Sequence, residues 1–250
     1  MIYSEQGYVG CFEMTDKDSG KHKVQQYVNE LIKLGHKRII APINGSTWHT
    51  YRLVSWTDSE PAFPMEPQNP IWYNEVFLEL GFTPIKKYRS DIFSTENIIP
   101  LKSRGSAISY RGFRADDLKL IYDIAIRGFD ENFLYNDIAF EEFSRLYQPL
   151  LPMMDSDLTI ITEVNGQPAG FLFSFAVENK LILKSITVLP EYRSLGIGSV
   201  LINRAIIAGQ QKGFNIAIAA LMSDDNYSRA IVAKYNSRKI REYTLYCLEV

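Results

Sequence analysis

The sequence predicts a mixed fold of helices and strands, α/β in the broad sense and α+β in the narrow one. Its sheet is mixed but mostly antiparallel and is flanked by helices. Three observations lead to this fold class. Short apolar runs rich in β-branched residues alternate with longer segments whose apolar residues recur at helical spacing. The pair Asn165-Gly166 joins two of the apolar runs, which is a strong signal for a tight hairpin. Hydrophobic residues make up 46% of the 250 residues, which is enough to bury a core and excludes a disordered chain.

The first hundred residues alternate between predicted strands and helices. Gly35 and Gly81 end the two helices, in the position where helices commonly finish on a left-handed residue. The expected elements are a strand over 8–14, a helix over 23–34, a strand over 38–43 and a helix over 71–80. The order helix, glycine, strand, helix also describes residues 199–235. We therefore interpret residues 1–100 as a degenerate partial copy of the second part of the chain.

Residues 106–250 contain the elements of a complete α/β domain, after a short linker (99–105) rich in Pro, Gly and basic residues. The expected elements are a strand over 107–110, helices over 114–127 and 137–146, strands over 158–164, 169–178 and 181–188, a helix from 197 to the stop at Gly213, a strand over 215–221, a short helix capped within 224–226 that ends at 235, and a strand over 243–250. The three central strands follow one another through short polar turns, which indicates an antiparallel meander.

Charge and rare residues narrow the class of function. Lys and Arg total 27 against 29 Asp and Glu, and this near balance argues against nucleic acid or a membrane surface as the main partner. The two cysteines, Cys11 and Cys247, have no metal-like or redox-like spacing, so no metal is expected. All three histidines precede residue 50, so the second domain must work without histidine. No signal peptide or membrane-length apolar run is evident, so a cytoplasmic location is expected.

The segment after the third meander strand carries the chemistry. The strand ends at Val188, Pro190 breaks it, and Arg193 precedes two glycines, Gly196 and Gly198, at the start of a helix. First-turn N–H groups have no acceptor within the helix, and the helix dipole favours an anion there. Glycines remove the side chains that would keep phosphate oxygens away from the backbone. A third glycine and a Gly-Lys-Ser/Thr string are both missing, so neither a dinucleotide fingerprint nor a P-loop is present.

Arg193-Ser194-Leu195-Gly196-Ile197-Gly198 resembles the acyl-CoA-binding motif of the GCN5-related N-acetyltransferase (GNAT) superfamily, Arg/Gln-x-x-Gly-x-Gly/Ala, at every specified position. The Val-x-Pro-x-Tyr phrase before it is also typical of that superfamily. The resemblance extends over residues 106–250 in element order. It implies a GNAT-like sheet in that part of the chain, preceded by a partial GNAT-like domain over residues 1–100.

The resemblance also implies a site for acetyl-CoA as co-substrate. The pyrophosphate would lie on backbone amides from Arg193 to Ser199, and the pantetheine arm would pair with the strand end. The amide of Val188 would steady the oxyanion, and Tyr235 would protonate the leaving thiolate. The implied coenzyme-binding residues are Ile186, Thr187, Val188, Arg193, Ser194, Leu195, Gly196, Ile197, Gly198, Ser199, Asn226 and Ser228.

Two parts of this site are left open by the sequence. The family phrase Asn-x-x-Ala-x-x-x-Tyr-x-x-x-Gly-Phe is incomplete: the spacing to Tyr235 fits Ser228 rather than Asn226, and no Gly-Phe follows. The general base is equally open. Its candidates are carboxylates of the meander and of the helical region before it: Glu163, Glu178, Asp130, Glu131 and Asp137.

The function expected from these features is acetyl-CoA-dependent transfer of an acyl group to a primary amine by direct attack. The acceptor is a small molecule or a peptide that the sequence does not identify, and a homodimer is left open. The alternative is an acyl-CoA-binding or regulatory module without turnover. An aminoacyl-transferase that uses charged tRNA is weakened by the near-neutral charge and the short first part.

Two segments of the first part bear on ligand binding. At the position equivalent to Arg193–Ser199, residues 15–20 read Thr-Asp-Lys-Asp-Ser-Gly, and these aspartates would repel a pyrophosphate. We therefore expect one coenzyme site per chain. Residues 44–52 are dense in polar and aromatic groups and follow a strand, where a ligand could be held. A capped helix with a packed Trp48 is the favoured interpretation of that segment.

Overall fold

The structure is a computed structural model that describes residues 6–105 and 107–250. The chain folds into two compact units. The first comprises residues up to Ser90 together with 223–225 and 239–250, and the second comprises 91–222 and 226–238. The predicted division into residues 1–100 and 106–250 stays a prediction, since these compact units follow other bounds.

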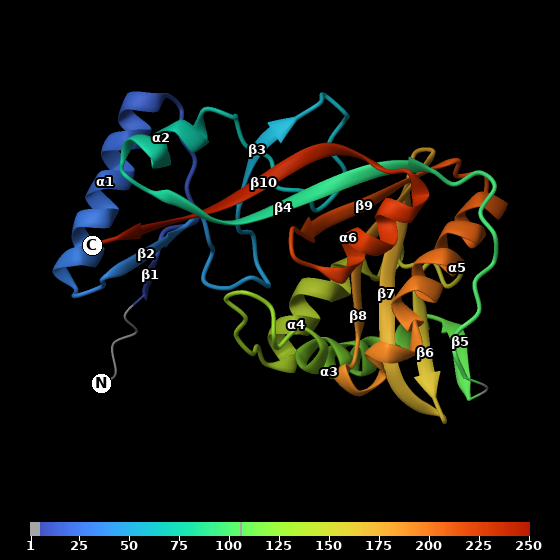
Figure 1. The fold of residues 1–250 in the computed structure, drawn as a ribbon. Helices are drawn as coiled ribbons and strands as arrows, with labels where there is room; N and C mark the ends of the chain where they lie inside the picture. The colour runs from blue at the N-terminus through green and yellow to red at the C-terminus, as the bar shows by residue number, and fades with distance from the viewer. Residues whose placement is uncertain (1–5, 106) are drawn as a thin grey trace. The chain divides into compact units, whose positions relative to one another are not determined.

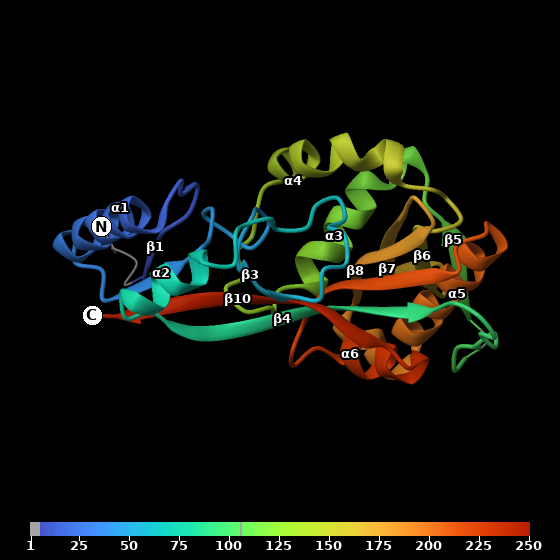
Figure 2. The ribbon, with the colours of Figure 1, turned by 90° about the horizontal axis from the view of Figure 1, so that it is seen from above.

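The first unit is a sheet with two helices. Its elements are β1 (Gln6–Tyr8), α1 (Lys17–Lys33), β2 (Arg38–Ala41), β3 (Leu53–Thr57), α2 (Tyr73–Glu79), the start of β4 (Thr83–Ser94) and most of β10 (Arg238–Glu249). The strand order is β1-β2-β10-β4, with β3 also paired to β10. Strands β1 and β2 are parallel, whereas β10 runs antiparallel to β2 and β3. Both helices lie on the same face of this sheet (Figure 2).

Aromatic packing fixes the core of the first unit. Phe77 of α2 is fully buried, stacks on Tyr246 of β10 at 5.8 Å between ring centroids and meets Phe82 edge-on at 5.2 Å. Val24 and Val28 of α1, four residues apart, face the same core. The helices are thus held to the sheet mainly by apolar burial.

The second unit is a sheet with helices on both faces. Its elements are the end of β4, β5 (Ile108–Gly112), a 3₁₀ turn (Ala115–Asp117), α3 (Leu118–Gly128), α4 (Phe140–Tyr147), a 3₁₀ turn (Gln148–Met153), β6 (Ile160–Val164), β7 (Gln167–Val177), β8 (Lys180–Val188), a 3₁₀ turn (Pro190–Leu195), α5 (Ile197–Gln211), β9 (Ile216–Ser223), α6 (Tyr227–Val232) and a 3₁₀ turn (Ala233–Tyr235). The strand order is β9-β8-β7-β6-β5. Helices α3 and α4 lie on one face, and α5 and α6 on the other (Figures 1 and 2).

The meander predicted from the sequence is present. Strands β5 to β8 pair antiparallel in sequence order, and β9 pairs parallel to β8 after the crossover helix α5. The apolar residues Leu201, Ala205 and Ile206 of α5 are buried against this sheet. The predicted fold class, a mostly antiparallel sheet flanked by helices, is therefore confirmed.

The structure corrects the predicted elements of the first part. The strand expected over 8–14 ends at Tyr8, because Gly10 packs against the carbonyl of Ile43 and Cys11 has a φ of 53°, which leaves extended geometry. Helix α1 begins six residues before the predicted start, where Asp16 caps it. Strands β3 and β4 are additional to the elements that the sequence predicts.

Candidate functional site

Strands β8 and β9 separate at one end of the second unit. Their parallel pairing runs from Lys180 and Ile216 to Leu183 and Ala219 and goes no further, although both strands continue. Two residues beyond the last pair, Leu221 has a φ of 59°, so β9 departs from extended geometry there. Residues 184–188 of β8 consequently make no ladder pair with β9.

The backbone of β8 presents polar groups at this open edge. Leu189 N donates to Ala169 O at 2.8 Å, which makes the neighbouring pair Gly170–Val188 a non-hydrogen-bonded pair of the β7–β8 ladder. The N–H and C=O of Val188 therefore point away from β7, toward the side where β9 has diverged. Ile186, two residues earlier, presents its backbone in the same direction.

A glycine loop follows the open edge. The 3₁₀ turn Pro190–Leu195 leads to Gly196, which has a φ of 75° and stands at the N-cap of α5. Glycine adopts this left-handed conformation without steric cost, and a Cβ built there meets no heavy atom within 4 Å. A Cβ on Gly198 would make only ordinary contacts, the nearest at 3.7 Å to Ile231. No side chain of Gly196 or Gly198 therefore covers the N-terminal amides of α5.

Arg193 does not reach over this loop. Its Nη1 lies 2.5 Å from Glu131 Oε2, its Nε donates to Val188 O at 3.2 Å and its Nη2 to Gly128 O at 3.4 Å. The positive charge of this motif residue is thus paired with Glu131, just beyond the end of α3. The backbone amide of Arg193 remains part of the loop.

Two further contacts tie α3 to the turn Pro190–Leu195 and to the end of β8. Arg127 Nη2 lies 2.7 Å from Glu191 Oε1, and this pair contributes, after a hydrogen bond from the backbone of Glu191, to lowering the pKa of that carboxyl. The Thr187 hydroxyl donates to Gly128 O at 2.9 Å. A Cβ on Gly128 would lie only 2.3 Å from Thr187 Oγ1, so glycine permits this approach.

The residues predicted from the later helix lie close to the same core. Asn226 caps α6, with Oδ1 accepting from Ser228 N at 3.1 Å, and Ser228 is buried. The ring of Tyr235 stacks on Phe93 at 5.3 Å. Burial raises the pKa of Tyr235, and a hydrogen bond with Asn203 of α5 opposes this shift. Tyr235 packs on the apolar cluster that also receives Ile186 and Val188.

The candidate bases are distributed over several elements. Glu163 of β6 pairs with Arg111 at 2.9 Å, Glu131 pairs with Arg193, and Asp137 accepts from Tyr135 Oη at 2.9 Å. Glu178 stands in the β7–β8 turn with a φ of 53°, and Asp130 precedes Glu131. Three of the five carboxylates thus already hold a cation or a hydroxyl. The geometry does not select one of the five as the base.

The first unit contains a related arrangement whose loop is closed. Like β8, α5 and β9, the elements β1, α1 and β2 form a parallel strand pair joined through a helix. Here the carboxylate of Asp16 accepts from Ser19 N at 2.9 Å and caps α1 itself. The Met14 side chain packs so closely on Gly20 that a Cβ would lie 2.4 Å from its sulfur. The side chains of Asp16 and Met14 therefore fill the space at the start of α1, whereas the corresponding space at the start of α5 is open.

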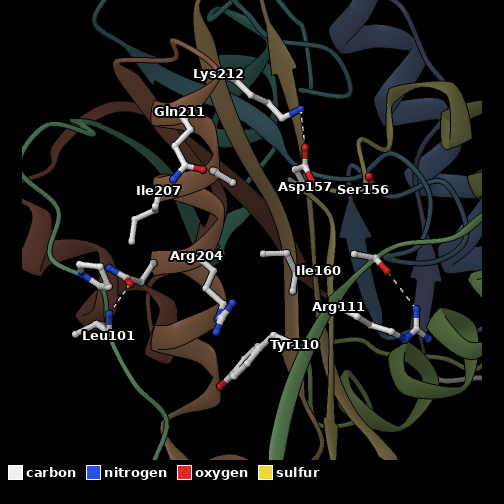
Figure 3. Close-up of a pocket in the computed structure, with 14 residues that line it drawn as sticks. Leu101, Tyr110, Arg111, Ser156, Asp157, Ile160, Arg204, Ile207, Gln211 and Lys212 are labelled. Carbon is white, nitrogen blue, oxygen red and sulfur yellow. Dashed lines mark hydrogen bonds and ion pairs between the residues drawn. The ribbon is translucent and has the colours of Figure 1, made fainter.

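A cavity of about 600 Å³ lies elsewhere in the second unit, between α5 and strands β5 and β6 (Figure 3). Arg204 projects from α5 over the ring of Tyr110, with Cζ 4.5 Å from the centroid. Lys212 pairs with Asp157 at 2.9 Å, and Arg111 pairs with Asp117 and Glu163. None of the predicted site residues lines this cavity. This cavity is therefore distinct from the coenzyme site that the sequence predicts.

Most of the second unit matches a known protein family. Residues 121–235, which include β8, the glycine loop and α5, match the family model described as the acetyltransferase (GNAT) family. This stretch is a GNAT domain. An uncharacterised N-acetyltransferase of Methanocaldococcus jannaschii is 32% identical over 108 residues, which are 40% of this chain and 46% of the relative. The chain thus matches less than half of that relative's length.

Solved structures share the fold over most of the chain. A GCN5-related N-acetyltransferase from Sphaerobacter thermophilus superposes with a TM-score of 0.63 at 13% identity, over 94% of this chain and 69% of that one. A tandem GNAT protein from the clavulanic acid biosynthesis pathway superposes with a TM-score of 0.54 at 11% identity, over 91% of this chain and 69% of that one. At these identities the likeness concerns the fold alone. The GNAT domain supports acyl transfer as the general chemistry.

Two kinds of feature are missing from the part of the chain that the structure describes. No helix within it is both long and apolar enough to cross a membrane. Residues 6–105 and 107–250 also contain no group of three His, Cys, Asp or Glu side chains arranged to hold a metal ion.

Proposed function

We propose that the chain is an acetyl-CoA-dependent N-acetyltransferase that transfers the acetyl group to a primary amine by direct attack. The observation that carries the proposal is the open edge of β8. There the Val188 N–H points away from β7, next to the glycine loop that begins α5. In a GNAT domain this combination supplies a strand edge for the pantetheine arm of coenzyme A and a helix N-terminus for its pyrophosphate.

The residues at the loop fit a pyrophosphate. Backbone amides from Arg193 to Ser199 would donate to it, and the α5 dipole favours the negative charge. Gly196 and Gly198 leave the approach to these amides clear. Arg193 contributes through its backbone and, by holding Glu131 and Val188 O, positions the loop. Ile186 and Val188 would pair with the amides of the pantetheine arm as a neighbouring strand does.

Side-chain and backbone groups of the protein would then take part in the transfer of the acetyl group from the thioester to the amine. Acetyl-CoA brings the activated acyl group. The Val188 N–H would donate to the thioester oxygen as charge develops on it. The acceptor nitrogen forms the new C–N bond, the C–S bond breaks, and the Tyr235 hydroxyl gives its proton to the leaving sulfur. A carboxylate, directly or through water, takes the proton that the amine loses.

A matched pair of variants at Gly198 tests coenzyme binding. Gly198→Asp places a negative charge at the loop, whereas Gly198→Asn places a neutral side chain of the same size at a position where a Cβ is tolerated. Calorimetric titration with coenzyme A should show a loss of affinity on the order of 100-fold for Gly198→Asp, and a much smaller one for Gly198→Asn. Equal affinities of wild type and Gly198→Asp would refute the proposed site.

Turnover is tested separately with an amine panel. Release of free thiol from acetyl-CoA should depend on a primary amine, either a small molecule or a peptide N-terminus or lysine. Tight coenzyme binding with no thiol release for any amine, and no effect of Tyr235→Phe, would indicate a binding module instead. The panel also identifies which class of amine is the acceptor.

A further inference from the structure

Residues 44–52 form a closed loop in the first unit that ends on a buried arginine. Ile43 and Tyr51 form an isolated antiparallel bridge, and Asn44 N donates to Thr50 O at 3.0 Å. Arg52 follows directly, with a φ of 68° and only 8% of its surface exposed. A left-handed backbone at a non-glycine residue persists only where the surroundings impose it, and such residues cluster at functional positions.

Three tyrosine rings surround the Arg52 guanidinium. Its Cζ lies 4.1 Å from the ring centroid of Tyr51, 4.2 Å from that of Tyr88 and 5.8 Å from that of Tyr243. The Tyr51 and Tyr88 centroids are 5.7 Å apart and their planes meet at 84°. Cζ and these two centroids form a nearly right-angled triangle, so the two nearest rings make a corner around the guanidinium rather than a sandwich. Ring faces attract a cation but accept no N–H hydrogen bonds of normal strength.

The charge of Arg52 has no carboxylate partner among the described residues. Its Nε and Nη1 are buried and make no hydrogen bond. Arg241 of the same unit shows the usual arrangement, because its Nη1 lies 2.8 Å from the buried Glu66. Asp225, a carboxylate that influences the neighbouring Tyr88, is already paired with Lys86 at 2.5 Å. The guanidinium therefore leaves one positive charge uncompensated in an aromatic environment, which is unfavourable without an anion.

We propose that Arg52 anchors a binding site for a small monocarboxylate, reached from the side of Tyr51. Tyr51 is the partly exposed wall of the corner, whereas Tyr88 and Tyr243 are buried, so a ligand meets the guanidinium by displacing the Tyr51 ring. A carboxylate carries the single negative charge that balances Arg52, and its two oxygens match the guanidinium fork. Inorganic phosphate is a mixture of monoanion and dianion at neutral pH, and its dianion would leave a net negative charge among the rings. The site exists independently of acyl transfer in the second unit.

Thermal unfolding separates this site from a purely structural arginine. In carboxylate-free buffer, Arg52→Met should unfold at the same or a higher temperature than wild type, because it removes an uncompensated buried charge. Sodium acetate, at constant ionic strength, should raise the unfolding temperature of wild type more than that of Arg52→Met, since a ligand stabilises the state that binds it. A clear fall in the unfolding temperature of Arg52→Met, together with an equal response of both proteins to acetate, would overturn the proposal.

Arginine side-chain spectra provide a direct readout in the wild-type chain. With guanidinium-labelled arginine, the Arg52 Nε–H signal, assigned by its absence in Arg52→Lys, should shift saturably with sodium acetate and less with inorganic phosphate. Arg241 Nε–H is the internal control, since that nitrogen is also buried but its guanidinium already holds Glu66. Parallel, unsaturable shifts of both signals would contradict a site at Arg52. Tighter binding of phosphate than of acetate would overturn the assignment to a carboxylate.

Discussion

The guanidinium of Arg193 bridges Glu131 Oε2, at 2.5 Å, and the carbonyl of Val188, at 3.2 Å. It thereby connects the strand end that presents the open edge to the segment just beyond α3. The pair is exposed, with 38% and 69% of the side chains accessible, so its direct contribution to stability is small. Its effect should instead be on the position of the loop.

Arg193→Gln is expected to weaken coenzyme binding several-fold, because the loop loses its link to Val188 O and Glu131, while stability changes by less than about 1 kcal/mol. Glu131→Gln should have a smaller effect in the same direction. Binding titration and urea unfolding of both variants and of the double variant measure this. Strictly additive losses in coenzyme affinity would show that the two side chains do not act together.

Gly128→Ala should destabilise the protein by about 1–3 kcal/mol, because the new Cβ would lie 2.3 Å from Thr187 Oγ1 and force α3 away from β8. Thr187→Ala removes the obstructing atoms as well as the hydrogen bond to Gly128 O. In the background of Thr187→Ala, the same glycine substitution should therefore cost clearly less. Urea unfolding of the four proteins gives the coupling, and equal costs in both backgrounds would refute the steric explanation.

The sequence predicts the elements whose signals are local. The meander and α5 are predictable because Asn165-Gly166 marks a hairpin and Gly196 marks a helix start, whichever strands lie beside them. Strand β4 is not predictable in this way, because its run contains Pro84, Lys86 and Lys87. It also pairs with strands that are remote in sequence, including β10. Strand propensity is weak where pairing and burial decide the outcome.

The candidate site is predictable as a motif but not as a set of contacts. The pattern from Arg193 to Gly198 predicts a helix start with glycines, and the structure has one. Whether the Arg193 side chain faces the loop or α3 depends on where Glu131 lies, 62 residues earlier in the chain. The burial of Arg52 is equally inaccessible from the sequence, since it depends on Tyr88 and Tyr243 from distant strands.

Tyr235→Phe should lower kcat by about 100-fold if the hydroxyl protonates the leaving thiolate, with little change in coenzyme affinity. Burial raises the pKa of Tyr235 above the ordinary value of 10, so the hydroxyl keeps its proton throughout the neutral and mildly alkaline range. The rate profile of wild type should accordingly show no loss from this group below about pH 10. A kcat for Tyr235→Phe within about twofold of wild type would remove this residue from the mechanism.

Asp117 should contribute to stability in a pH-dependent way. Its carboxylate accepts from Arg111 at 2.7 and 2.8 Å and from Arg114 N at 2.7 Å. Burial alone would raise the pKa of Asp117, but these hydrogen bonds, with that from Arg111 the largest, lower the pKa overall. Because the folded-state pKa lies below the unfolded value of about 3.9, the contribution is complete above that value and is lost as the pH falls through the folded pKa.

Asp117→Asn should therefore destabilise the protein by about 2 kcal/mol at pH 7, because it removes a charged acceptor that is only 9% exposed and leaves Arg111 with Glu163 alone. The difference from wild type should shrink as the pH falls from about 4 to about 2, below the unfolded value of about 3.9 and toward the lower folded-state pKa of Asp117. Asp123→Asn, at an exposed carboxylate of α3, is the matched control and should change stability by less than about 0.5 kcal/mol. Urea unfolding across this pH range measures both variants, and a difference for Asp117→Asn that stayed constant down to about pH 2 would contradict the assignment of this stability to the ionised carboxylate.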